Sequence, residues 1–299
     1  MNRLLPLSLS LLLLPLFTFL ASSCRTTADP AAEKLLSEAR ALSESPVRRD
    51  RESALLLLDS LHKAFPTEVS LRKEAIRLSR LLRLGMSTED SLLFATEYAR
   101  DSALLSELDP LFIRSGYPGM PADVTVMRYK GYEPKDATGA LFLDILLRHD
   151  ASLQIVAGCS GSKIPAITCL KAEDPVSGDY ETGDTIPVTD AGRNYRFTTG
   201  GITRARLTLS QEASERIAAF VALKESEGAA LRFSLTDGGD KVIRSFALTP
   251  REAEAIRETY RFYAAYVEMK SLEEKMQRHA LYRNRLRSEE AQEERALEK

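Results

Sequence analysis

The sequence TPREAEAIRETYRFYAAYVEMK, residues 249–270, decides much of the fold because it begins a helix that nothing later in the chain interrupts. Thr249 can cap this helix, Pro250 suits its first position, and Glu252 can complete a capping box with Thr249. No Pro or Gly follows before Lys299. The pattern predicts one helix of about 45 residues, far longer than the average of about 11.

An apolar seam runs along the first half of this predicted helix. Its positions recur at intervals of four, three and four residues, as in a coiled coil: Ile256, Tyr260, Tyr263 and Val267. Beyond Met276 the seam thins, and the end of the chain is almost wholly charged or alanine. We expect the first half to pack against another helix and the end to project.

A partner helix is predicted from Thr88 to about Leu108, where Phe94, Tyr98 and Leu105 form an apolar stripe. An antiparallel pairing of this stretch with the start of the C-terminal helix is the simplest arrangement. It would close the chain around the segment that lies between the two helices.

That segment, about 122–248, reads as mostly β-strand. Apolar runs and alternating patterns are separated by turn residues, most clearly at Asp237-Gly238-Gly239-Asp240. The expected strands are 124–128, 141–147, 153–157, 164–170, 195–199, 202–209, 231–236 and 241–248. One helix that Ser210 can cap interrupts them. The pattern predicts an antiparallel sheet or sandwich with one helix packed across it.

The region 33–112 reads as nearly all helical, with apolar positions three or four residues apart. Its boundaries are marked by residues that start or stop helices. Asp50 can cap a second helix, Pro66 can end it, and Gly85 with Ser87 is expected to separate a third helix from the fourth.

The segment 52–84, with Ala54, Leu58 and Pro66, resembles a tetratricopeptide-type helical hairpin. The resemblance covers little more than one repeat, and no second copy follows at a period of about 34 residues. It implies a groove that holds a peptide of a partner protein. Three ordinary antiparallel helices remain the alternative.

Taken together, these patterns predict an α+β fold with N-terminal antiparallel helical hairpins, a central mostly antiparallel β domain with one packed helix, and a long C-terminal helix pairing as an antiparallel coiled coil. The expected parts are a signal peptide at 1–23, a tether at 24–32, a helical region at 33–112, a β-rich domain at 122–248 and the long helix at 249–299.

The first 24 residues have the pattern of a bacterial export signal. A positive start with Arg3 precedes an apolar run from Leu4 to Leu20, and three small residues lead to Cys24. A transmembrane helix is one alternative, but Pro6 and Pro15 interrupt the run. A plain secretory peptide is another, and it would leave an unpaired thiol on an exported protein.

Residues 20–24, Leu-Ala-Ser-Ser-Cys, resemble the bacterial lipobox, although Leu20 stands four places before the cysteine rather than the usual three. The resemblance implies that Cys24 becomes the first mature residue and carries a diacylglycerol and an acylated amine. Several acyl chains, each gaining about 0.8 kcal/mol per buried methylene, would hold the protein on the lipid bilayer without a span.

The residue after the cysteine indicates which bacterial membrane would hold the anchor. Arg25 stands where an aspartate would favour retention at the inner membrane, so the resemblance favours the outer membrane. The polar tether that follows lacks the acidic cluster of some surface lipoproteins. We therefore expect the chain to face the periplasm rather than the cell surface.

Cys159 and Cys169 are the remaining cysteines. A disulfide is the default for a pair in an exported protein, and the two lie on strands expected to adjoin around Ser160-Gly161-Ser162. A bridge over so short a loop would stabilise the fold by roughly 2 to 3 kcal/mol. Two buried reduced thiols are the alternative, because the register need not bring them together.

Signals for catalysis, metals and cofactors are weak, and we assign no catalytic residue, no metal ligand and no cofactor. Ser160 follows a glycine and a cysteine in a pattern faintly similar to a serine-protease loop, but His149 lies too near it for that family, so a turn explains the residues better. His62 and His279 lack ligand partners at metal-binding spacing. An acidic loop could in principle hold calcium, although its spacing fits no known loop: Asp174, Asp179, Glu181 and Asp184.

Composition narrows the classes of partner. The chain has 41 Lys and Arg against 43 Asp and Glu, and this interspersed balance argues against a nucleic-acid partner.

The arrangement as a whole resembles Gram-negative lipoproteins in which a lipobox precedes helical hairpins, a small β domain and a long C-terminal helix. We expect a membrane-anchored interaction or scaffold protein with a protein partner in the envelope. A lipoprotein whose β-rich domain binds a small molecule, glycan or peptide is the alternative, and a hydrolase is the least supported class.

Overall fold

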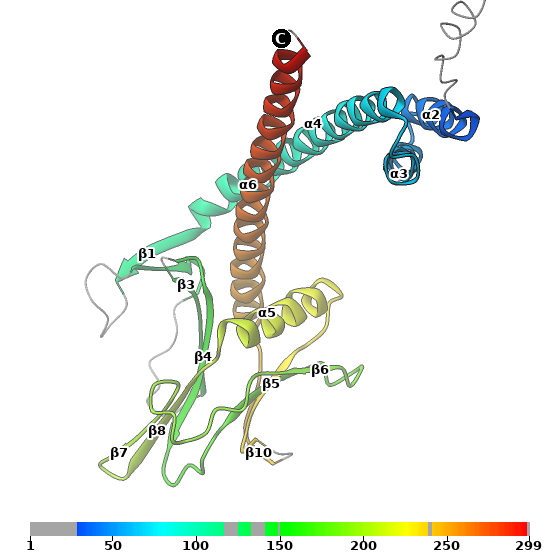
Figure 1. Cartoon of the computed structure of the whole chain (residues 1–299). Helices are drawn as coiled ribbons and strands as arrows, with labels where there is room; N and C mark the ends of the chain where they lie inside the picture. The colour runs from blue at the N-terminus through cyan, green and yellow to red at the C-terminus, as the bar shows by residue number, and fades with distance from the viewer. Residues whose placement is uncertain (1–28, 117–124, 133–140, 149, 239–240, 298–299) are drawn as a thin grey trace, which may run out of the picture. The chain divides into compact units, whose positions relative to one another are not determined.

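The computed structural model describes residues 29–116, 125–132, 141–148, 150–238 and 241–297 (Figure 1). These residues form two compact units. The first contains the described residues up to Leu92 together with those from Arg278 onward, and the second runs from Leu93 to Gln277. Cys24 and its tether up to residue 28 lie outside the described residues, as does His149.

The predicted α+β class is confirmed, and two very long helices are prominent in it. Helix α4 (Val69–Leu108) has 40 residues and helix α6 (Pro250–Leu297) has 48. The capping box at the start of α6 is present, because the backbone N–H of Thr249 donates to Glu252 at 2.7 Å and the N–H of Glu252 donates to the Thr249 hydroxyl at 3.3 Å. None of the helices among the described residues is both long enough and apolar enough to span a membrane.

The first unit contains α2 (Pro30–Ser43), α3 (Arg48–Ala64), the first part of α4 and the end of α6. Each of α2, α3 and α4 buries one apolar face in a common core. That core contains Leu36, Ala39, Ala54, Leu58, Leu61, Ala75 and Leu82. Helix α3 ends before Pro66 as predicted, but its N-cap is Val47 rather than Asp50, which lies in its first turn and accepts from the Ser45 hydroxyl at 2.6 Å.

The predicted helix break at Gly85 and Ser87 is wrong, because α4 passes through both residues. A glycine inside a helix costs only about 1 kcal/mol relative to alanine. Leu82 and Met86 on either side of it are buried, and their burial offsets that cost. Ser87 is itself buried rather than part of a loop.

The second unit holds two antiparallel sheets, one of six strands in the order β1-β2-β3-β4-β8-β7 and one of four in the order β10-β9-β5-β6. The strands of the six-stranded sheet are β1 (Phe112–Gly116), β2 (Thr125–Tyr129), β3 (Leu141–Arg148), β4 (Leu153–Gly161), β7 (Asn194–Thr199) and β8 (Ile202–Thr208). The other four are β5 (Cys169–Glu173), β6 (Tyr180–Thr182), β9 (Arg232–Thr236) and β10 (Val242–Ala247).

One hydrophobic core joins these sheets to helix α5 (Gln211–Ser226) and to the start of α6. Ile155 of β4, Phe233 of β9, Ile217 of α5 and Ile256 of α6 are each fully buried in it. As predicted, the Ser210 hydroxyl caps α5 by accepting from the Ala213 N–H at 3.2 Å. The predicted helix across a sheet is therefore confirmed.

The expected hairpin of strands 153–157 and 164–170 does not form. Strand β4 continues through Ser160 to Gly161 and pairs with β8, whereas β5 begins only at Cys169 and pairs with β9 and β6. Pro165 cannot donate to a strand ladder, which explains why 164–168 is not a strand. Strands β1 and β6 were not expected from the sequence pattern.

Candidate functional site

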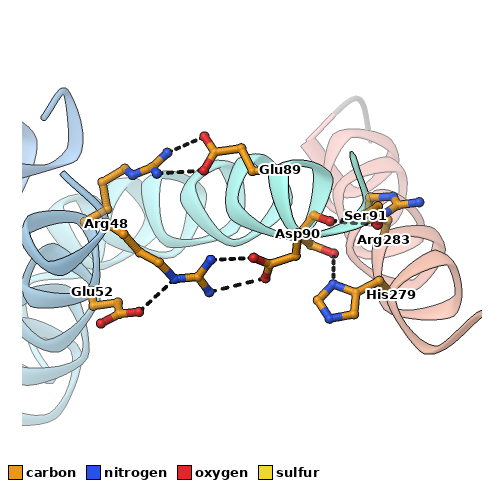
Figure 2. Close-up of polar contacts among 9 residues, drawn as sticks. Arg48, Glu52, Glu89, Asp90, Ser91, His279 and Arg283 are labelled. Atoms are coloured by element: carbon orange, nitrogen blue, oxygen red, sulfur yellow. Dashed lines mark hydrogen bonds and ion pairs between the residues drawn. The ribbon is translucent and has the colours of Figure 1, made fainter. Parts of the chain in front are cut away.

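The first unit carries the candidate site, a groove along α4. Figure 2 shows the polar side chains that hold α3 and the end of α6 against α4. At the N-terminal end of α3, the Arg48 guanidinium donates to both carboxylate oxygens of Asp90, and its Nε donates to Glu52 at 3.1 Å. Arg51 makes a second two-bonded pair with Glu89, at 2.5 and 2.7 Å. These pairs hold the beginning of α3 against the middle of α4.

The hydrogen bonds also perturb the carboxyl groups. The Arg48 guanidinium holds the pKa of Asp90 below its ordinary value, and Arg51 does the same for the pKa of Glu89. Both pairs are partly exposed, so solvent screening limits what they add to the free energy of unfolding. Their two-bonded geometry therefore contributes more to orientation than to stability.

The end of α6 is attached to α4 next to this cluster. The Ser87 hydroxyl lies 3.0 Å from Nδ1 of His279, and Arg283 donates to the Ser87 carbonyl at 3.1 Å and to the Ser91 hydroxyl (Figure 2). Ser87 and Ser91 are one helical turn apart and share a face of α4. Ser87, one of the two residues expected to break the helix, is thus part of its contact with α6.

The groove lies between the C-terminal end of α2 and the face of α4, and it has a volume of about 840 Å³. Ile76, Leu78 and Leu81 supply its apolar lining. Arg40 of α2 is paired with Glu74 of α4 across it. Lys73 and Arg77, one turn apart on α4, also line it and are exposed with no ion-pair partner among the described residues.

Helix α6 limits the groove at Glu293. Its carboxylate accepts a hydrogen bond of 2.6 Å from Arg80, whose side chain is 8% exposed, and this bond raises the pKa of the Arg80 guanidinium. A smaller cavity of about 260 Å³ shares Ile76 with the groove, and its lining includes His62, Arg80 and Glu289. His62 lies 3.4 Å from the Arg72 guanidinium.

The cysteines lie in different sheets of the second unit. Both Cys159 of β4 and Cys169 of β5 are buried as free thiols, and burial raises the pKa of each. Their expected places on adjoining strands are wrong, because β4 and β5 do not pair.

Ser160 lies within β4 opposite Arg204, so the expected turn at this residue is wrong. The acidic loop does not converge on one point, because each carboxylate has its own partners. Asp174 accepts from the Val176 N–H and the Ser177 hydroxyl; Asp179 pairs with Lys224, Glu181 with Arg216 and Asp184 with Arg193. Among the described residues no group of three or more potential ligands is placed to hold a metal ion.

Comparisons with protein-family models, with curated proteins and with solved structures find no match. The candidate site is a groove on a helical unit, with an apolar lining beside two cations that have no ion-pair partner in the described part of the chain.

Proposed function

We propose that the protein is a membrane-anchored lipoprotein of the bacterial envelope that acts as a non-catalytic protein-interaction or scaffold module. The groove along α4 carries this proposal. It pairs the exposed apolar side chains of Ile76 and Leu81 with the unpaired charges of Lys73 and Arg77. A protein segment with apolar residues and neighbouring carboxylates would match both features.

The size of the groove supports a segment rather than a whole domain. A volume of about 840 Å³ suits the side chains of a short peptide. Helix-in-groove recognition uses apolar anchors spaced by helical turns, and salt bridges at the rim add selectivity. The Arg40–Glu74 pair across the groove and the Arg80–Glu293 bond at its limit would keep the groove preformed, which lowers the cost of ordering on binding.

The anchor in this proposal is Cys24, acylated and inserted in the outer membrane with the chain facing the periplasm. The leader sequence supports it, with the apolar run before Ala21-Ser22-Ser23 and Arg25 after the cysteine. Cells fed labelled fatty acid should incorporate label into the wild type and not into Cys24→Ala. Equal label in the variant would refute the anchor and leave the groove proposal standing.

A charge-reversal comparison tests the groove. We expect affinity capture from solubilised envelope to recover one specific protein with the wild type and to lose it with Lys73→Glu/Arg77→Glu. Arg49→Glu/Arg251→Glu is the matched control, because it changes the net charge equally at two exposed positions outside the groove. Recovery of the same proteins with all three chains would contradict the proposal.

A second candidate function rests on a cavity in the other unit. About 300 Å³ in volume, it is lined by Gln211 at the start of α5 and by Tyr263, Tyr266 and Lys270 of α6. Burial and the hydrogen bond to Glu215 raise the pKa of Tyr263 to about 12, so its phenol stays protonated as a donor. Aromatic rings beside polar groups suit a small molecule or glycan. A thermal-shift screen of the whole chain in which no sugar or metabolite raises the Tm would count against this alternative.

A further inference from the structure

The hairpin of β7 and β8 carries a second surface that the proposed function does not use. Its two strands are joined by Gly200 and Gly201, which have φ of 55° and 78°, the conformation that a two-residue hairpin turn requires. Figure 1 shows this hairpin projecting from the second unit, away from α5 and from the part of α6 in that unit.

One face of the hairpin alternates cations with apolar side chains. In the register of the two strands, Tyr195 lies opposite Arg206, Phe197 opposite Arg204, and Thr199 opposite Ile202. Ala205 and Leu207, which alternate with the arginines along β8, are buried in the core. Arg204 and Arg206 therefore point to the outer face of the sheet.

The apolar members of this face are unusually exposed. Tyr195 and Ile202 are each 48% exposed and Phe197 is 38% exposed. The rings of Tyr195 and Phe197 lie side by side, with centroids 6.2 Å apart. Exposed aromatic rings at a projecting hairpin are typical of side chains that enter the headgroup layer of a membrane.

The charge of the hairpin has one sign. Between Asn194 and Thr208 the sequence has three arginines and no Asp or Glu. On the same face of the sheet, the carboxylate of Asp144 is already bound by Arg128 through two hydrogen bonds of 3.0 and 3.1 Å. Arg204 and Arg206 thus have no carboxylate on the hairpin itself to neutralise them.

Arg206 is less exposed than Arg204 on this face. Its Nε atom is buried and has no hydrogen-bond partner among the described residues. The residue lies between Tyr195 on β7 and Gly158 on β4, where the Phe142 ring covers the glycine. A buried guanidinium N–H without an acceptor is costly.

We infer that the outer face of the β7–β8 hairpin, formed by Tyr195, Phe197, Ile202, Arg204 and Arg206, docks on the surface of an anionic lipid bilayer. The arginines would bind lipid phosphates while their stems and the exposed rings enter the interface. A projecting apolar hairpin fits an extended lipid surface better than a discrete peptide. The inference does not depend on acylation of Cys24.

A vesicle experiment tests this with the chain from Arg25 to Lys299, which contains every described residue and no acyl group. We expect it to co-sediment with vesicles containing phosphatidylglycerol and not with pure phosphatidylcholine. Since each arginine near an anionic surface contributes roughly fivefold to partitioning, Arg204→Gln/Arg206→Gln should bind about 30-fold more weakly. Arg49→Gln/Arg251→Gln, which removes the same charge elsewhere, should bind like the unmodified chain.

A second readout uses the absence of tryptophan from the chain. Emission from Ile202→Trp should shift to the blue on adding phosphatidylglycerol vesicles, and emission from Leu56→Trp, on the other unit, should not. Equal vesicle binding by the hairpin and control variants, or no shift at Ile202→Trp, would overturn the inference. Tighter binding of polyglutamate than of vesicles, lost in Arg204→Gln/Arg206→Gln, would assign the surface to an acidic protein segment instead.

Discussion

Replacing a glycine with alanine should have opposite effects on stability at two positions, one crowded and one open. Gly158 is in the middle of β4, between β3 and β8. A Cβ atom added there would lie 2.3 and 2.5 Å from two atoms of the Phe142 ring and 2.6 Å from the Ala205 carbonyl oxygen. Gly85 is in the interior of α4, and a Cβ added there meets nothing within 4 Å.

The expected sizes follow from these contacts. Non-bonded carbon atoms are most stable about 3.5 to 4.0 Å apart, so Gly158→Ala forces a shift of about 1 Å. The Phe142 ring can move, but the Ala205 carbonyl belongs to a paired strand, which places the cost near the upper end of the usual range of about 1 to 3 kcal/mol. Gly85→Ala should instead stabilise by about 0.5 to 1 kcal/mol, because alanine favours the helix.

Thermal unfolding followed by circular dichroism measures both changes. At roughly 2 to 4 °C per kcal/mol for a domain of this size, Gly158→Ala should lower the Tm of the second unit by about 6 to 12 °C. Hydrogen exchange of the amides around residue 85 should slow in Gly85→Ala. A Tm within 1 °C of wild type for Gly158→Ala would refute the packing of Phe142 over the glycine. Faster exchange in Gly85→Ala would refute a continuous α4.

Other predictions concern pH, capping and thiols. The pKa values of Asp90 and Glu89 are lowered in the folded chain, so the stabilisation from these carboxylates is present above pH about 4 to 5 and is lost as the pH falls through the folded pKa values. On acid titration, Asp90→Asn/Glu89→Gln should therefore lose less helix stability than the wild type. An identical profile would contradict the ion pairs with Arg48 and Arg51. Ser210→Ala removes the α5 cap and should lower the free energy of unfolding, measured with urea, by about 1 kcal/mol. No change would show that the cap does not stabilise the fold. Cys159 and Cys169 should resist alkylation in the folded chain and both react in denaturant without reductant; reaction only after reduction would mean that they are bridged.

Local signals in the sequence predicted the parts of the fold that local contacts stabilise. Thr249 with Glu252 and the cap at Ser210 each act within one helical turn, and the Gly200-Gly201 turn joins strands that pair directly. Such features need no knowledge of the rest of the chain. For this reason the long C-terminal helix, helix α5 and most strands were predictable.

Features that depend on distant contacts were not predictable. The strand after β4 in the sequence lies in the other sheet, so the expected hairpin that would have brought Cys159 and Cys169 onto adjoining strands does not form. Arg48 and Asp90 are 42 residues apart, and no pattern shows which of many arginines will meet which carboxylate. Lys73 and Arg77 were identified only by the groove around them and by the lack of partners. In the sequence they look like ordinary surface charges.

The measurement that tests the central proposal most directly is photo-crosslinking in intact cells with a light-activated residue placed in the groove. At Leu81, which lines the groove and is 48% exposed, we predict one discrete crosslinked protein that disappears in Lys73→Glu/Arg77→Glu. At Leu56, which is 70% exposed on α3 and does not line the groove, we predict none. The same crosslinks at both positions, or a Leu81 product unaffected by charge reversal, would contradict the account.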